Sequence, residues 1–148
     1  MQLDPHLSFN GDCEAAFQFY EKCLGGNITF IMPYEGSPMA SQVPAAWRNK
    51  VLHATLKVGD RVLTGADVPP DQDQKPAGFS MTVGVTDPEG FSITIGVTDP
   101  AEAERVFQAL SENGTVRMPL QETFWAIRFG MLVDRFGIPW MINCGKAA

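Results

Sequence analysis

Residues 90–114, GFSITIGVTDPAEAERVFQALSENG, decide the fold, because here a strand pattern runs directly into a helix pattern. Apolar residues alternate over the first part, which is typical of a half-buried strand. Asp99 can then cap a helix, Pro100 suits the first helical position, and Glu102 comes three residues after the cap. The helix carries an apolar stripe made of Val106, Phe107 and Leu110. Such a stripe needs a sheet to lie on, so the stretch predicts a helix packed against a sheet.

Three strand patterns come after this helix and complete the second half of the chain. They occupy residues 115–120, 124–134 and 138–144, and the turn DRFG joins the last two. The first half has the same order. Residues 3–9 favour a short strand, residues 10–26 a helix with Asp12 as its cap, residues 27–34 a strand, and residues 51–67 a hairpin. Both halves therefore have the predicted order strand, helix, strand, strand, strand (βαβββ).

The boundaries between these parts are set by composition. Residues 68–77, VPPDQDQKPA, are rich in proline and polar residues and are the expected linker. We therefore expect a first module at residues 1–67 and a second at 90–148. Together they are expected to form a single α+β domain over residues 1–148.

Residues 78–89 are a near copy of residues 90–101, with which they agree at nine of twelve positions. The first copy ends in the sequence DPEG, which favours a turn, so we do not expect it to begin a helix. It can form a hairpin with the second copy, replace that copy in the sheet, or lengthen the connection. We expect an added strand near a dimer interface, because exposed strand edges invite association; the competing interpretation is a tolerated duplication without function.

Composition excludes several classes of partner. The formal net charge is −6 and no basic cluster opposes it, which argues against nucleic acid or an anionic membrane as a partner. No apolar run approaches the roughly 20 residues that span a bilayer, and the N-terminus lacks a signal-peptide pattern. The three cysteines lack a redox motif, so we expect reduced thiols and a cytoplasmic protein.

The chain resembles the vicinal oxygen chelate superfamily, also called the glyoxalase/bleomycin-resistance/dioxygenase fold, and within it the PhnB-like branch. The resemblance extends over nearly the whole chain and rests on PHLSFNGDCEAAFQFYEKCLGG, VLHATLKVGDRVLTGAD, DPAEAERVFQALSENG and MPLQETFWAIRFGMLVDRFGIPW. It implies two βαβββ modules side by side, whose curved sheets enclose a cavity for a small organic ligand. It also implies a homodimer.

The resemblance further implies a divalent metal ion held by His and Glu side chains. His6 stands at or next to the first of these positions, but the corresponding strand of the second module offers Ser80 or Ser92. The expected Glu position holds Met141. We therefore expect no conventional metal centre. An atypical set of His6, His53 and Glu122, with Glu35 or Asp67 as a further member, is the alternative.

Four residues are the candidates for ligand binding and chemistry. His53 lies in VLHATL, where strand alternation puts it on one face with Val51 and Thr55. Trp47 and Trp125 are candidate ligand-binding residues, and Glu122 is a candidate catalytic base. Each residue also has a structural interpretation. His53 can be hydrogen-bonded within the sheet, the two tryptophans can be core residues, and Glu122 can be a surface charge in a loop. Phe124 and Trp140 are further aromatics that such a pocket can include.

Three functions remain open on the sequence alone. The first is a small-molecule-binding protein without a working metal centre. The second is a metal-dependent lyase, isomerase, dioxygenase or thiol transferase with an atypical ligand set. The third is a module whose oligomeric state is controlled by the duplicated strand.

Deletion of residues 78–89 tests whether the duplication is needed for folding. Because the second copy alone leads into the capped helix, we expect the deletion variant to fold and to unfold cooperatively in a thermal melt. Its mass in solution, compared with that of the full chain, reports whether the copy controls the oligomeric state. A variant that is unfolded or aggregated would refute this expectation.

Overall fold

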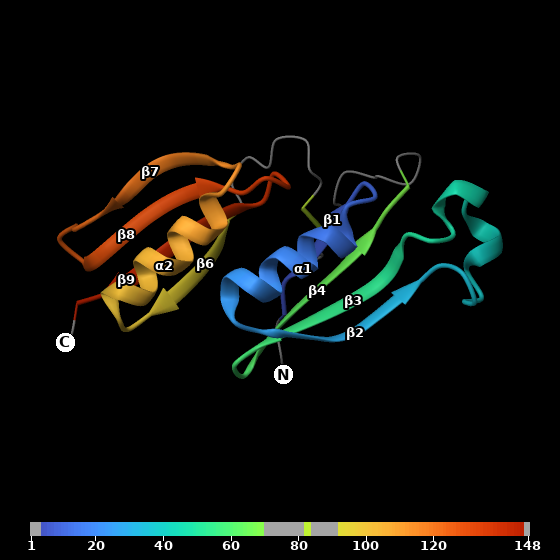
Figure 1. Cartoon of the computed structure of the whole chain (residues 1–148), viewed down its shortest axis with the longest axis horizontal. Helices are drawn as coiled ribbons and strands as arrows, with labels where there is room; N and C mark the ends of the chain where they lie inside the picture. Colours follow the sequence, from blue (N-terminus) through green and yellow to red (C-terminus); the bar gives the residue numbers. More distant parts are fainter. Residues whose placement is uncertain (1–3, 70–81, 84–91, 147–148) are drawn as a thin grey trace. The chain divides into compact units, whose positions relative to one another are not determined.

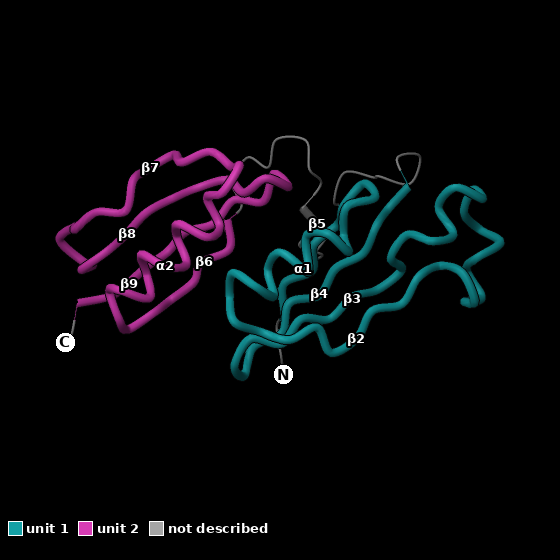
Figure 2. Tube along the Cα trace, viewed as in Figure 1, with its two compact units in different colours: residues 1–85 teal, residues 86–148 magenta. Residues whose placement is uncertain are grey.

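The computed structural model describes residues 4–69, 82–83 and 92–146. The chain forms two compact units, residues 1–85 and residues 86–148 (Figure 2). Most of the predicted linker at residues 68–77 lies outside the described residues, as does the first copy of the duplicated strand except for residues 82–83. The expected cavity between modules stays a prediction.

Unit 1 is a five-stranded sheet with one helix on it. Its elements are β1 (His6–Phe9), α1 (Cys13–Leu24), β2 (Asn27–Pro33), η1 (Ala40–Gln42), η2 (Ala45–Trp47), β3 (Val51–Val58), β4 (Arg61–Asp67) and β5 (Thr82–Val83). The strand order is β2-β3-β4-β1-β5. Strand β1 pairs in parallel with β4, whereas β2, β3 and β4 are antiparallel neighbours. Figure 1 shows α1 lying across one face of this sheet.

The start of α1 differs from its prediction. Asp12 is the N-cap residue, but its side chain forms no capping hydrogen bond. The carboxylate of Asp67, at the end of β4, accepts hydrogen bonds from the amides of Gly11 and Cys13 instead, each at 2.9 Å. A residue distant in sequence therefore binds the backbone on either side of Asp12, whose own side chain forms no cap. The helix ends at Gly25, whose left-handed backbone (φ 67°) suits glycine.

Asp67 connects four segments of unit 1. Besides the two amides before and within α1, its Oδ2 accepts from the amide of Val51 at 2.9 Å, at the start of β3. The Tyr34 hydroxyl donates to the Asp67 backbone carbonyl at 2.8 Å. The side chain is 1% exposed. Buried carboxylates are tolerated only when hydrogen bonds replace water, and here three backbone amides do so.

The core of unit 1 lies between α1 and the sheet. Leu7, Phe17, Tyr20, Ala54 and Leu56 are fully buried there. Gly65 of β4 lies directly under Phe17, since a Cβ at this glycine would come within 2.6 Å of the Phe17 ring. Strand residues beside Gly65 in register therefore face the helix, and their sequence neighbours face away from it.

Unit 2 repeats the same order of elements in a four-stranded sheet. It contains β6 (Ile93–Val97), α2 (Pro100–Ser111), β7 (Thr115–Gln121), β8 (Ala126–Val133) and β9 (Pro139–Gly145). The strand order is β6-β9-β8-β7, and β6 pairs in parallel with β9 as β1 does with β4. The two sheets and two helices confirm an α+β fold of two βαβββ modules.

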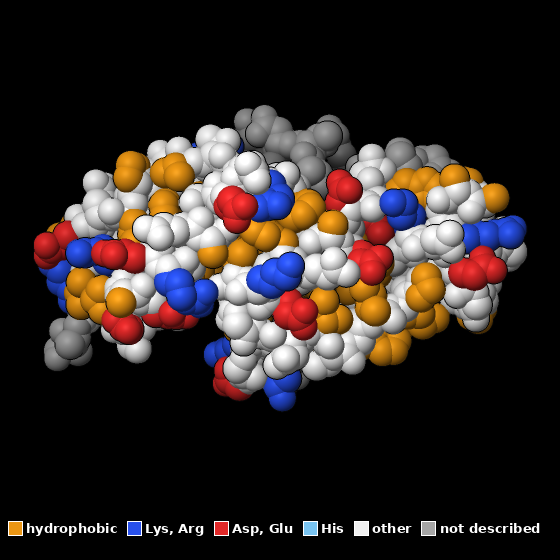
Figure 3. Space-filling view, in the orientation of Figure 1, with side chains coloured by type: hydrophobic (Ala, Val, Ile, Leu, Met, Phe, Trp, Pro, Cys, Tyr) orange, Lys and Arg blue, Asp and Glu red, His pale blue; other side chains and the backbone are white. Residues whose placement is uncertain are grey.

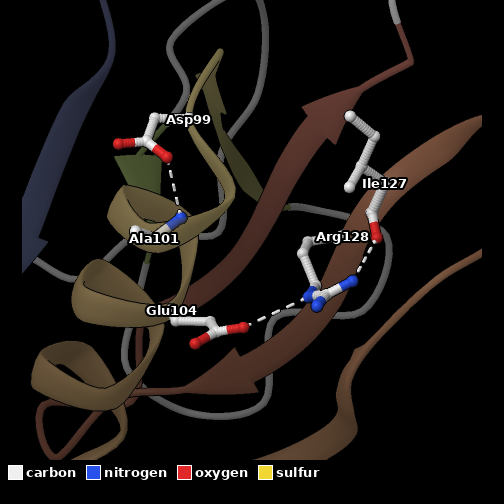
Figure 4. Close-up of polar contacts among 5 residues, drawn as sticks. All are labelled: Asp99, Ala101, Glu104, Ile127 and Arg128. Carbon is white, nitrogen blue, oxygen red and sulfur yellow. Dashed lines mark hydrogen bonds and ion pairs between the residues drawn. The ribbon is translucent and has the colours of Figure 1, made fainter.

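The predicted start of α2 is confirmed. The Asp99 carboxylate accepts from the amide of Ala101 at 3.0 Å, and Pro100 occupies the first turn. Further along, Glu104 of α2 accepts a hydrogen bond from Arg128 of β8 at 3.2 Å, while another nitrogen of Arg128 donates to the carbonyl of Ile127 (Figure 4). The capping bond thus fixes the strand-to-helix junction, and the ion pair links α2 to its sheet.

The described parts of the two copies lie in different sheets. In the first copy, Thr82–Val83 form β5, which pairs in parallel with His6 and Leu7 of β1. In the second copy, Ile93–Val97 form β6 beside β9. The described part of the first copy therefore extends the sheet of unit 1, and no hairpin between β5 and β6 is present among the described residues.

The surface carries charges of both signs. On the face drawn in Figure 3, Lys and Arg side chains are interspersed with Asp and Glu side chains. Within the part of the chain that the structure describes, neither helix has the length and apolar character needed to cross a membrane. All three cysteines are buried, and none belongs to a disulfide bond.

Replacing Asp67 by Asn tests its role in unit 1. Asparagine retains one oxygen for Gly11 and Cys13, but its amide group then faces the Val51 N–H, which loses its acceptor. We expect a loss of about 2 kcal/mol in the free energy of unfolding, measured by urea titration. The matched control is Asp60→Asn, whose side chain is 92% exposed, and this change should stay within about 0.5 kcal/mol. Equal stability of D67N and the parent protein would contradict this role.

Candidate functional site

Both histidines of the chain lie on the face of the unit 1 sheet that is opposite α1. Gly65 faces α1, and it is paired with Leu7 on β1 and Ala54 on β3. The residues next to these in sequence, His6, Thr64 and Thr55, are paired in the same way and point to the opposite face. His53 lies two residues before Thr55 on β3 and shares this face. Strand register alone therefore brings the two histidines to one surface.

The side chains on this surface form a compact group. The rings of His6 and His53 are stacked, with centroids 6.3 Å apart and planes inclined by 21°. Phe30 of β2 lies 6.0 Å from the His53 ring and is 48% exposed. Met32 is the register partner of His53. We call this group the histidine face; it consists of His6, Phe30, Met32, His53, Thr55 and Thr64.

The hydrogen bonds of Thr64 favour one tautomer of His6. Its Nδ1 lies 2.8 Å from the hydroxyl oxygen of Thr64. That hydroxyl also donates to the carbonyl of Pro5 at 3.3 Å. A hydroxyl has one proton, so when it donates to Pro5 it must accept from His6. His6 then carries its proton on Nδ1, and the neutral ring presents Nε2 as a free acceptor.

The surroundings of His6 favour its neutral form. Burial, and then the charge of His53, holds the pKa of His6 below its ordinary value of 6.5. His53 is itself held by a threonine, since its Nε2 lies 3.1 Å from the hydroxyl of Thr55. The face thus offers two oriented imidazoles beside an exposed aromatic ring, an arrangement suited to binding a molecule with both polar and apolar parts.

The donor set of this face does not fit a three-ligand metal centre. Among the residues that the structure describes, no group of three or more His, Cys, Asp or Glu side chains is placed to hold one ion. Asp67, a possible further ligand by sequence, uses both carboxylate oxygens on backbone amides. His6 and His53 are a pair, whereas catalytic metal sites usually have three protein ligands. No chemical step through a metal is therefore derived for this face.

Glu122 belongs to unit 2, directly after β7. Its side chain is 68% exposed and forms an ion pair with Lys146 at 2.9 Å. The hydrogen bond from Lys146 and its charge hold the pKa of Glu122 below its usual range. A general base at neutral pH usually needs a raised pKa, so this environment favours a surface ion pair. Its role as catalytic base stays a prediction.

The tryptophans have three different environments. Trp47 lies in η2 of unit 1 and is half-buried. Trp125 of unit 2 is 47% exposed and has edge-to-face contacts with Phe124 and Phe129. Trp140 is 2% exposed and donates to Asp134 at 2.8 Å, so it is a core residue. The structure brings together His6 and His53 in unit 1, while Trp125 and Glu122 are residues of unit 2.

Sequence reasoning placed Thr55 on the face of His53 but missed Thr64, Phe30 and Met32. A signal for Thr64 was present, because the hairpin turn at Gly59 and Asp60 pairs Val58 with Arg61. Counting back along both strands from that pair places Thr55 opposite Thr64. No comparable signal existed for Phe30, since a register irregularity lies between Ile28 and Phe30.

Comparisons with known proteins agree with this architecture. The family model described as Glyoxalase/Bleomycin resistance protein/Dioxygenase superfamily matches residues 2–142. Protein YjdN of Escherichia coli (strain K12) is 30% identical over 154 aligned residues, covering 99% of this chain and 97% of YjdN. Protein PA1353 from Pseudomonas aeruginosa, whose crystal structure is known, is 41% identical in sequence with a TM-score of 0.81. The match covers 99% of this chain and 99% of PA1353.

A more distant solved structure shows the same fold. It is described as a putative 3-demethylubiquinone-9 3-methyltransferase, PhnB protein, from Bacillus cereus. It is 20% identical with a TM-score of 0.72, and the match covers 98% of this chain and 100% of that one. At this identity the likeness shows the fold alone.

The lowered pKa of His6 predicts a pH dependence of stability. The unfolded chain binds a proton at His6 near its ordinary pKa of 6.5, whereas the folded protein does so only at lower pH. Below about pH 6.5 the unfolded state therefore binds more protons, and the free energy of unfolding falls as the pH falls from 7 to 5. His6→Asn should make this decrease smaller in urea titrations at the two pH values. An identical decrease in H6N and the parent protein would be the contrary result.

Proposed function

Because the chain belongs to the Glyoxalase/Bleomycin resistance protein/Dioxygenase superfamily, we propose that it binds a small organic molecule on the histidine face of unit 1, without a resident metal ion. The stacked pair of His6 and His53 is the observation that carries this proposal. One fold hosts many chemistries, so the proposal rests on the residues of the face and takes no substrate from the relatives.

The polar contribution of the face is a hydrogen bond to His6. In its Nδ1–H form, His6 offers Nε2 as an acceptor, and its lowered pKa keeps the ring neutral. A hydroxyl or an N–H group of the ligand can donate to this nitrogen. His6 thus selects for a hydrogen-bond donor and contributes no charge at neutral pH.

The apolar contribution comes from β2. Phe30 is about half exposed beside His53, and Met32 lies further along on the same face. An exposed aromatic ring beside a flexible thioether offers an adaptable surface for the carbon skeleton of a ligand. The ligand class is therefore a small organic molecule with a hydroxyl or N–H group and an apolar part.

We further propose that the chain forms a homodimer. Strand β6 is at the edge of the unit 2 sheet, and no described strand pairs with its outer side. Exposed strand edges favour association. The mass of the full chain in solution tests this proposal, and a monomer at micromolar concentration would contradict it.

Metal content is the first test of the metal-free site. We expect protein purified without chelators, and then incubated with one equivalent of Zn²⁺, Ni²⁺, Fe²⁺ or Mn²⁺ and desalted, to retain far less than one ion per chain. One ion per chain that is lost in His53→Ala would contradict the proposal. In that case Glu35→Gln and Glu122→Gln would identify which carboxylate completes the ligand set.

Ligand binding is measured on the two histidines themselves. They are the only histidines in the chain, so their ring C–H signals in NMR spectra can be assigned with His6→Asn and His53→Asn. We expect benzyl alcohol to shift both ring signals more strongly than its methyl ether, which cannot donate a hydrogen bond. Equal shifts with both probes, or none with either, would count against the proposed site.

A further inference from the structure

Unit 2 contains a buried polar atom without a hydrogen-bond partner. Among the side chains that the structure describes, the Oδ1 atom of Asn143 on β9 is buried and accepts no hydrogen bond. Buried acceptors in native proteins nearly always have a donor, and an unpaired one destabilises the folded state. Asn143 is therefore expected to meet a donor that the described residues do not supply.

Asn143 lies on the face of the unit 2 sheet that is opposite α2. A Cβ at Gly130 would come within 2.6 Å of Phe107 of α2, so Gly130 faces the helix. Gly130 is paired with Ile142, and the next pair along the strands, Phe129 with Asn143, points to the opposite face. The amide and the aromatic ring are thus neighbours on the surface that α2 leaves open.

Most of the surroundings of this amide are apolar, with Thr94 beside Met141 as the exception, and there is room beside the amide. Met131 and Met141 form the next pair on the same face, two residues further along each strand. Gly96 of β6 is the register partner of Asn143 on the other side, and a Cβ at Gly96 would meet no atom within 4 Å. The amide therefore has an aromatic ring on one flank and open space on the other.

An exposed pair of aromatic rings continues from Phe129. The Trp125 ring lies 5.4 Å from Phe129, and the Phe124 ring lies 4.6 Å from Trp125, both in edge-to-face contact. Phe124 is 89% exposed and Trp125 is 47% exposed. Large exposed aromatic side chains are uncommon on surfaces that bind nothing, because water solvates them poorly.

We propose that Asn143, Phe129 and Trp125 form a binding site for a small aromatic molecule that carries one N–H or O–H donor. The ring of the ligand lies against Phe129 and Trp125 on the open face of the sheet, and its donor binds Asn143 Oδ1. Rotation of the amide about its terminal bond, which has a broad energy minimum, turns the oxygen toward that face. The site lies wholly within unit 2, so it does not rest on the function proposed for the histidine face.

A water molecule is a poorer occupant than such a ligand. A buried water needs two to four polar partners, and the two register partners of Asn143, Gly96 and Phe129, have no polar side chain. An aromatic ring with a single donor needs one acceptor and an apolar surface, which is what this face offers.

Phenol and anisole are the probes that test the site, because they differ in the O–H donor. NMR spectra of the amide groups and of the aromatic rings are recorded during each titration. Phenol should shift the amide signals of Asn143 and Phe129, and it should bind about fivefold more tightly than anisole. Asn143→Leu keeps the volume and removes the acceptor, so it should abolish the preference, whereas the control Met141→Leu should retain it. Equal affinities of the two probes for the parent protein, or phenol shifts confined to the His6 and His53 ring signals, would overturn the proposal.

The stability of Asn143→Leu tests the unpaired amide without any ligand. If Asn143 Oδ1 lacks a donor in the free protein, its replacement by an apolar side chain of similar size should raise the melting temperature by about 2 °C or more. A lower melting temperature would mean that the amide is already satisfied within the folded protein, which contradicts the proposal. The comparison of phenol with anisole on the parent protein remains decisive if the variant does not fold.

Discussion

A single buried carboxylate organises unit 1. Asp67 is the last residue of β4. Its two carboxylate oxygens accept hydrogen bonds from the amides of Gly11 and Cys13, at the start of α1, and of Val51, at the start of β3. Removing a carboxylate from water is costly, so these three segments must converge wherever the carboxylate is buried. These bonds hold the end of β4 beside the start of β3 and beside the segment that joins β1 to α1. The register of the same three strands places both histidines on one face.

The histidine face results from this register together with hydrogen bonds between the histidines and two threonines. Parallel pairing of β1 with β4 puts His6 beside Thr64, and the hairpin puts Thr55 beside Thr64. The hydroxyl of Thr64 then orients one ring and that of Thr55 the other. The resemblance to the superfamily implied a metal ion. The described residues of this face supply two imidazoles with aromatic and apolar neighbours. These features support the binding of an organic molecule.

The sequence predicted the features that depend on local patterns. The capped start of α2 at Asp99, the order of elements in both modules and the pairing of β3 with β4 all arise from short-range signals. It missed the features that depend on distant residues. One is the start of α1, where the amides of Gly11 and Cys13 donate to Asp67 and the Asp12 side chain forms no cap. His6 and His53 were found by residue type, but their stacking needed the strand order. The unpaired amide of Asn143 has no sequence signal, because an asparagine on a strand is usually satisfied.

The protonation of the His6 ring is the measurement that tests this account most directly. Nitrogen-15 NMR of the two imidazoles at neutral pH distinguishes a protonated nitrogen from a bare one and from one bound to metal. The account predicts a neutral His6 with its proton on Nδ1, beside Thr64, and a bare Nε2 that is available to a ligand. A His6 ring with its proton on Nε2, or with Nε2 bound to a metal ion in the protein as purified, would contradict it.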